Sequence, residues 1–315
     1  MCVALALRLT PWSGPEPPLM PSSSLEKFLM LYSRSFPIRR GKLRVVNSLW
    51  RATAGDQSTH RVATLKHGRF KMPCDLGEML QRQFYFFGTY FLEEDILSCW
   101  EAAAKGAKLI LDVGANAGIY SLAALAIQPH ATVHAFEPTA EIAARLRATA
   151  MLNGLDHLNV HEAAVLNKNG QAALRRFRGE LGDNEGMNFI SRDLCDSGTE
   201  CVKTVCVDQF CQDHSINQID LMKLDIQGQE HLALEGAERL IRSGHIGFIF
   251  LELNWAKSSG AACAATESIR LLEQAGYRFS RPGKCLNWRK AGDWLQSLSD
   301  VVAYRGRPSE VLQQQ

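Results

Sequence analysis

The sequence predicts an α/β fold built on a doubly wound, mostly parallel sheet. From residue 108 onward, short apolar runs of strand length alternate with longer segments of helical pattern. The expected strands are residues 108–113, 131–136, 158–165, 220–224, 246–253, 277–280 and 301–304. Strands that alternate with helices favour parallel βαβ units joined by right-handed crossovers. Such sheets bind ligands at the carboxyl ends of their strands, so the functional site is expected there.

Helices are expected between these strands, at residues 118–127, 140–153, 230–242 and 266–275. An irregular, glycine-rich stretch between Gly170 and Val207 predicts a hairpin insertion. Upstream of the first strand of the sheet, the pattern predicts a short strand at 69–72 and helices at 76–84 and 94–105. The aromatic run at 84–87 is more typical of a core than of a surface that stacks on a base.

We expect an N-terminal extension at residues 1–60, partly disordered or helical, followed by one domain at residues 61–315. Five prolines between residues 11 and 21 predict an irregular leader up to about residue 24. Seven basic residues and no acidic residue lie between Glu26 and Asp56; they are Lys27, Arg34, Arg39, Arg40, Lys42, Arg44 and Arg51. Such a run either contacts an anionic partner or forms a solvated basic helix face, and the second interpretation is favoured.

Composition favours a cytoplasmic protein without a metal site. A net charge of +2 creates no general attraction to nucleic acids or membranes. Nine scattered cysteines indicate reduced thiols, and no apolar run approaches the roughly 18 residues that a transmembrane helix needs. One group of cysteines with a histidine lacks the spacing of a zinc site; it comprises Cys195, Cys201, Cys206, Cys211 and His214.

The segment 109–118 joins a buried strand to a tight turn and then to a helix. Gly114 lets the backbone pass close to a ligand, and Gly118 lets the helix begin tightly packed against the strand. A dinucleotide-binding fingerprint would need glycine where Asn116 and Ile119 stand. The strand carries an acid, Asp112, which would repel a pyrophosphate and attract an ammonium group. The loop therefore favours S-adenosylmethionine over NAD.

The second strand of the sheet ends at an acid, Glu137. A carboxylate in this place can accept hydrogen bonds from both hydroxyls of a ribose. Alone, Glu137 is equally consistent with a helix-capping acid. With Asp112 at this spacing, it describes a ligand with a cation at one end and a sugar in its middle.

Three segments together resemble the FkbM family of class I methyltransferases: 109–118, 136–138 and 222–228. The resemblance extends from about residue 84 to 253. It implies a seven-stranded sheet with an antiparallel last strand, S-adenosyl-L-methionine as methyl donor, and a hydroxyl acceptor on a small molecule or sugar. It also implies residues that line the cofactor, with the last of them beside the adenine: Asp112, Gly114, Asn116, Gly118, Glu137 and Ala164. The family usually has glutamate where this chain has Gln227.

Methyl transfer to a hydroxyl requires that the acceptor be aligned and that its proton be removed. Asp225 at the end of the fourth strand is the first candidate for this role, and Glu252 at the end of the fifth is the second. Two other functions remain open. The basic stretch 34–51 is compatible with an RNA or DNA methyltransferase, although nucleic acid is not the favoured partner. Gln227 is compatible with a cofactor-binding scaffold that has lost catalysis.

Overall fold

The computed structural model describes residues 24–305, apart from 55–58, 67, 69, 177, 180–181, 184–188, 192–199, 254–260, 284–285 and 288. The predicted leader, up to residue 23, lies outside the described residues, and so does Cys195.

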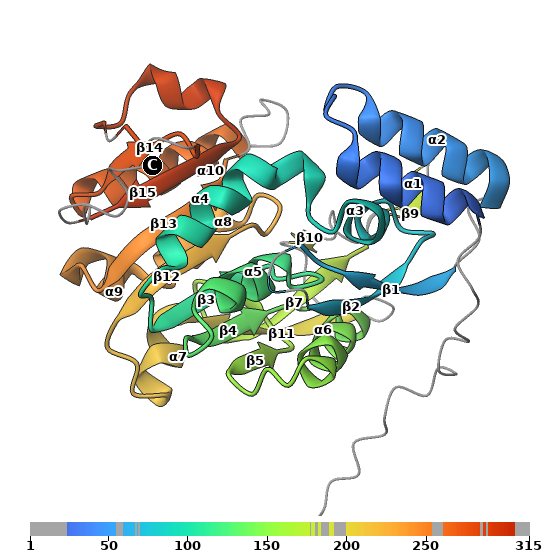
Figure 1. Cartoon of the computed structure of the whole chain (residues 1–315). Coiled ribbons are helices and arrows are strands. Elements are labelled where there is room, and N and C mark those ends of the chain that lie inside the picture. The colour runs from blue at the N-terminus through green and yellow to red at the C-terminus, as the bar shows by residue number, and fades with distance from the viewer. Residues whose placement is uncertain are drawn as a thin grey trace, which may run out of the picture.

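A seven-stranded sheet forms the centre of the molecule, in the order β14-β15-β13-β12-β3-β4-β5 (Figure 1). Its strands are β3 (Leu109–Val113), β4 (Thr132–Phe136), β5 (Leu158–His161), β12 (Ile219–Leu224), β13 (Ile246–Glu252), β14 (Arg278–Ser280) and β15 (Asp300–Tyr304). All neighbours are parallel except β15, which runs antiparallel to both β13 and β14. The predicted sheet is confirmed, including the antiparallel last strand that the family resemblance implies.

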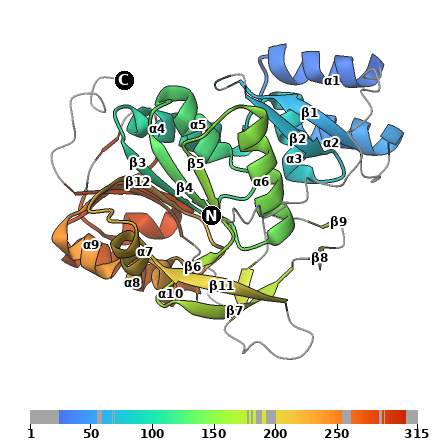
Figure 2. The same cartoon turned by 90° about the horizontal axis from the view of Figure 1, so that it is seen from below.

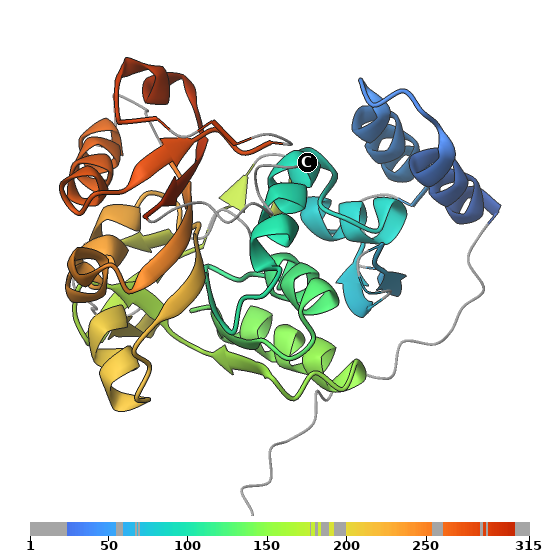
Figure 3. The ribbon, with the colours of Figure 1, turned by 60° about the vertical axis from the view of Figure 1, so that its left-hand side comes forward.

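Helices cover both faces of this sheet (Figures 2 and 3). One face carries α4 (Glu94–Ala104), α5 (Ile119–Ile127) and α6 (Ala140–Leu152); the other carries α7 (Val207–Asp213), α8 (Glu230–Glu235), α9 (Glu238–Ser243) and α10 (Ala261–Gln274). Successive strand residues point to opposite faces, so Ile110 belongs to one core and Leu111 to the other. This arrangement confirms the predicted doubly wound fold.

A second sheet lies beside the first, in the order β10-β7-β11-β6. Its strands are β6 (Ala164–Leu166), β7 (Gly170–Arg175), β10 (Phe189–Ser191) and β11 (Glu200–Cys206), and two-residue strands β8 (Arg178–Gly179) and β9 (Gly182–Asp183) pair nearby. The expected hairpin corresponds to β7 and β11, which are antiparallel. The single strand expected at 158–165 is wrong, because the chain turns after β5 and β6 pairs with β11 instead.

The single helix expected at 230–242 is also wrong, because α8 and α9 are separate helices. The break lies at Gly236, which packs against the backbone that ends β6. A Cβ atom at this glycine would lie 2.2 Å from the carbonyl oxygen of Leu166. The close approach of the end of α8 to the end of β6 therefore requires glycine here.

The N-terminal helices α1 (Ser24–Ser35) and α2 (Lys42–Ala54) pack beside α3 (Met79–Phe87) and the hairpin of β1 (His60–Thr64) and β2 (Lys71–Asp75) (Figure 1). The aromatic residues 84–87 are buried within α3, as expected for a core. Glu26 of α1 is buried, where it forms a 2.9 Å ion pair with Arg61 and accepts a 2.9 Å hydrogen bond from the Tyr85 hydroxyl.

Some of the basic residues in these helices have structural roles. The Arg34 guanidinium donates to the backbone carbonyls of Tyr85 and Phe86, near the end of α3. The Lys42 ammonium is buried and donates to the carbonyls of Ser33 and Phe36. The expected solvated basic face is therefore wrong for Lys42, which is buried, whereas Arg34 is exposed although its guanidinium binds α3.

The cysteines differ in state. Cys201 is disulfide-bonded, so the prediction of reduced thiols is wrong at this position. The free cysteines among the described residues are Cys74, Cys99, Cys206, Cys211 and Cys263. In the part of the chain that the structure describes, no helix has the length and apolar character needed to cross a bilayer. No group of three or more His, Cys, Asp or Glu side chains among the described residues is arranged to hold a metal ion.

Candidate functional site

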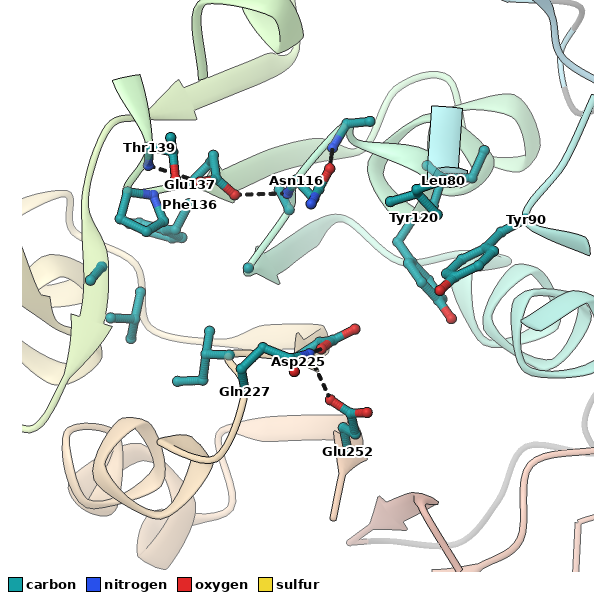
Figure 4. Close-up of a pocket in the computed structure, with 18 of the residues that line it drawn as sticks. Leu80, Tyr90, Asn116, Tyr120, Phe136, Glu137, Thr139, Asp225, Gln227 and Glu252 are labelled. Atoms are coloured by element: carbon teal, nitrogen blue, oxygen red, sulfur yellow. Dashed lines mark hydrogen bonds between the residues drawn. The ribbon is translucent and has the colours of Figure 1, made fainter. Parts of the chain in front are cut away.

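A pocket lies at the carboxyl edge of the central sheet, where ligands bind in folds of this type (Figure 4). Its volume of about 350 Å³ is within the range of small-molecule sites. Its lining comes from the loops after β3 and β4, the ends of β12 and β13, α3 with the segment after it, and strands β6, β7 and β10. The predicted site residues that line it are Gly114, Asn116, Glu137, Ala164, Asp225 and Glu252.

The loop after β3 is in close contact with the end of β12. Gly114 has a φ of 80°, and a Cβ atom there would lie 1.9 Å from the backbone oxygen of Asp225. Only glycine fits this conformation and this contact. The N–H groups of Gly114 and Ala115 both donate to the Phe136 carbonyl, at 3.0 and 2.9 Å. The loop is therefore rigidly tied to the end of β4.

Two of the predicted cofactor residues do not reach the pocket. The Asp112 carboxylate is 1% exposed and accepts hydrogen bonds from the backbone N–H (2.9 Å) and hydroxyl (2.6 Å) of Ser121. Asp112 therefore holds α5 against the sheet and is not placed to meet a ligand cation. Gly118 precedes α5 with a φ of 83°, and a Cβ atom there would lie 2.2 Å from Leu146 Cδ1. Its tight packing is against α6, not against the strand.

The carboxylate of Glu137 is fixed at the wall of the pocket. Its Oε2 accepts the Asn116 N–H at 3.1 Å, and its Oε1 accepts the Thr139 N–H at 2.8 Å. Each carboxylate oxygen can accept a further hydrogen bond, so ligand hydroxyls can still bind. The buried Thr139 hydroxyl beside it has no partner among the described residues. This region is therefore suited to a diol such as a ribose.

One end of the pocket is apolar. Ala164 lies at the start of β6, and Leu174 of β7 and Ile190 of β10 line the pocket with it. All three are buried side chains of the second sheet. A flat, weakly polar group such as a purine fits between surfaces of this kind.

Two carboxylates lie together at the ends of β12 and β13 (Figure 4). The Gln227 amide donates to Asp225 Oδ1 at 3.1 Å and to Glu252 Oε2 at 3.2 Å. The Lys223 ammonium lies 3.0 Å from Asp225 Oδ2. Gln227 adopts a φ of 56°, which directs its amide between the two acids. The residue that departs from the family pattern therefore holds this pair together.

The two carboxyl groups differ in protonation. Burial alone would raise the pKa of Asp225, but the Lys223 charge and the hydrogen bonds from Glu252, Lys223 and Gln227 outweigh it, so this pKa is lowered. Burial and the neighbouring Asp225 charge raise the pKa of Glu252 well above its usual range. The opposite directions of these two shifts favour an ionised Asp225 beside a protonated Glu252, which lets two acids share one buried site.

Three other residues at this end of the pocket were not predicted from the sequence: Tyr90, Glu93 and Tyr120. The Tyr120 hydroxyl donates to Glu93, and the Lys223 ammonium lies 4.8 Å from the centre of the Tyr120 ring. Burial raises the pKa of Glu93, although Lys223 opposes this shift. These residues precede the first strand of the sheet or lie in α5, so strand-end position gives no signal for them.

The sequence of this chain is similar to those of known methyltransferases. The profile of the methyltransferase FkbM domain matches residues 112–279, which is just over half of the chain. The 2-O-methyltransferase NoeI of Sinorhizobium fredii is 25% identical over 162 residues, covering 46% of this chain and 62% of that protein. The 31-O-demethyl-FK506 methyltransferase FkbM of Streptomyces tacrolimicus is 29% identical over 155 residues, which cover 41% of this chain and 59% of that protein. The chain thus spans about three fifths of these curated relatives.

Among solved structures, precorrin-6y C5,15-methyltransferase from Geobacter metallireducens has a TM-score of 0.38 and 11% identity, covering 68% of this chain and 89% of that one. A score at this level supports no inference about function.

The seven-stranded sheet with its antiparallel strand β15 is the fold that the resemblance to class I methyltransferases implies. The chain belongs to the FkbM methyltransferase family, and the predicted family is confirmed. S-adenosylmethionine, the cofactor of this family, is confirmed with it.

Proposed function

We propose that this protein transfers the methyl group of S-adenosylmethionine to a hydroxyl group of a small molecule or sugar. The observation that carries the proposal is one pocket that joins an apolar end, a carboxylate suited to a ribose, and the Asp225–Glu252 pair. The printed names of two relatives describe O-methylation of this kind. For the acceptor, we propose only the functional group, which is a hydroxyl.

The charge of the pocket fits this cofactor. Four of the described lining residues are acidic and none is basic; the acids are Glu93, Glu137, Asp225 and Glu252. A ligand with a sulfonium cation is stabilised among them, whereas the pyrophosphate of NAD would be repelled. Glu137 and the free Thr139 hydroxyl would hold the ribose, and Ala164 would lie beside the adenine. When bound, the cofactor supplies an activated methyl group.

We assign Asp225 the role of orienting the acceptor hydroxyl and taking up its proton as the new C–O bond forms. It is the ionised member of the pair, and Lys223 and Gln227 hold both of its oxygens in place. Glu252, in its protonated form, donates to Asp225 and limits the charge at this end of the pocket. Tyr90 and Tyr120 form a wall beside the acids, which would exclude water from the acceptor (Figure 4).

The structure favours neither of the two alternatives. Arg34 and Lys42 of the basic stretch bind backbone carbonyls of this protein, which weakens the case for a nucleic-acid surface. The replacement of glutamate by Gln227 does not dismantle the reacting end, because the amide still binds both carboxyl groups.

The test is transfer of tritium from methyl-labelled S-adenosylmethionine to a panel of sugars, polyols and hydroxylated macrolides, with RNA and DNA as comparison substrates. We expect a labelled methyl ether on at least one hydroxyl compound and no labelled nucleic acid. Asp225→Asn controls for contaminating activity. Labelling of RNA or DNA alone would contradict the proposal, and binding of the cofactor without transfer to any compound would support the scaffold.

A further inference from the structure

The Gln83 side chain of α3 is buried against the pocket with both of its polar atoms unused. It is 1% exposed and belongs to the pocket lining. Neither Nε2 nor Oε1 has a hydrogen-bond partner in the described part of the chain. A buried amide without partners destabilises the protein, and a ligand that completes its hydrogen bonds offsets that effect.

The backbone of the loop after β3 offers no free N–H donor to a ligand. Its backbone N–H groups all bind acceptors within the protein: those of Gly114, Ala115, Asn116, Ala117 and Gly118. Asp112, the expected partner of the ligand ammonium, is held by Ser121 away from the pocket. Since none of the described lining residues is basic, a ligand carboxylate must bind a neutral donor.

We propose that Gln83 binds the amino-acid end of S-adenosylmethionine, with Nε2 donating to the carboxylate and Oε1 accepting from the ammonium group. One amide thereby satisfies both charges of a zwitterion. Leu80, on the same helix, lies across the pocket from Glu137 and Thr139 (Figure 4). With the ribose at Glu137 and the adenine beside Ala164, the amino-acid end points toward α3. This inference rests on the proposed function.

The experiment compares two ligands by isothermal titration. S-adenosylhomocysteine contains the amino-acid end, whereas 5′-methylthioadenosine keeps the adenosine and the sulfur but lacks it. Gln83→Leu should lower the affinity for S-adenosylhomocysteine about 10- to 100-fold, because hydrogen bonds to charged groups are lost. Binding of 5′-methylthioadenosine should stay within about twofold of the wild type, since that ligand makes no such contact. Gln83→Met, which keeps the length of the side chain, is the second variant.

Gln81 offers a matched control on the same helix. Its side chain is also buried, but its Oε1 accepts the Asp75 N–H at 2.6 Å and it does not line the pocket. Gln81→Leu should lower the melting temperature and leave both affinities unchanged. Gln83→Leu should leave the melting temperature of the ligand-free protein unchanged or raise it, because leucine removes an unpaired amide.

Equal weakening of both ligands, or of neither, would overturn the assignment. A raised KM for the acceptor with unchanged S-adenosylhomocysteine affinity would overturn it too, and would place Gln83 at the acceptor. Wild-type protein that binds neither ligand would instead overturn the proposed function, before any variant is compared.

Discussion

The Lys223 ammonium is paired with the Asp225 carboxylate at 3.0 Å, and its side chain is only 3% exposed. Burial would lower the pKa of Lys223, but Asp225 and Glu93 outweigh burial and raise it. Lys223 does not line the pocket, so it stabilises the Asp225 charge from within the sheet. The ionised state of Asp225 therefore depends on a residue that lies outside the pocket lining.

Lys223→Met should destabilise the protein by about 3 kcal/mol, since it leaves a largely buried carboxylate without its cation. It should also raise the pKa of Asp225, so that turnover falls at neutral pH and partly recovers in more alkaline buffer. Urea unfolding and a pH–rate profile measure the two effects. A variant with wild-type stability and an unshifted profile would show that the ion pair does not control Asp225.

Asp225→Asn should lower turnover by about 10²–10⁴-fold and keep most of the affinity for S-adenosylhomocysteine, because the amide keeps the shape but accepts no proton. Glu252→Gln is the matched variant. Glutamine resembles the protonated acid, so turnover at neutral pH should stay close to that of the wild type. Full activity of Asp225→Asn beside an inactive Glu252→Gln would move the proton-accepting role to β13.

The raised pKa of Glu252 also predicts how stability changes with pH. Above the ordinary glutamate pKa of about 4.3, the unfolded chain releases this proton while the folded protein retains it. The contribution of Glu252 to the free energy of unfolding therefore falls as the pH rises, by up to about 1.4 kcal/mol per pH unit. The fall ends when the pH reaches the pKa of Glu252 in the folded protein. Glu252→Gln should remove that slope. Equal slopes for both proteins in urea unfolding between pH 5 and 8 would contradict the assignment.

Much of the site is predictable because acids at strand ends have a local sequence signal. Glu137 and Asp225 each directly follow an apolar strand, and both line the pocket. Asp112 breaks the rule because it lies within β3, one residue before its end, and its side chain turns toward α5. The period of the strand, not the nearness of the acid to the loop, decides which face a side chain reaches.

The rest of the site depends on tertiary packing. Gln83 and Glu93 come from α3 and the segment after it, and they reach the pocket only because that helix packs over the strand ends. The division of residues 158–165 into β5 and β6 likewise depends on a pairing with β11, which lies far along the chain. The local pattern predicts the helix and the strand, but it shows neither where the helix packs nor where the strand ends.

Gly114→Ala should unfold or severely destabilise the cofactor loop, because the new Cβ atom would lie 1.9 Å from the backbone oxygen of Asp225. Gly106→Ala is the matched control, since Gly106 has the same φ of 80° and a Cβ atom there would have no heavy atom of the described residues within 4 Å. The free energy of unfolding of the control should fall by only about 1–2 kcal/mol, which is the cost of a left-handed backbone for alanine. Similar unfolding free energies for the two variants would show that the contact with β12 is not tight.

The most direct test of a cofactor site at Glu137 is isothermal titration of the wild type and Glu137→Ala with S-adenosylhomocysteine and with NAD. The wild type should bind S-adenosylhomocysteine and not NAD. Loss of the Glu137 carboxylate should weaken binding by about 2–4 kcal/mol, on the scale of charge-assisted hydrogen bonds in a buried site, without loss of the fold. Tighter binding of NAD, or unchanged affinity in Glu137→Ala, would contradict this placement of the cofactor.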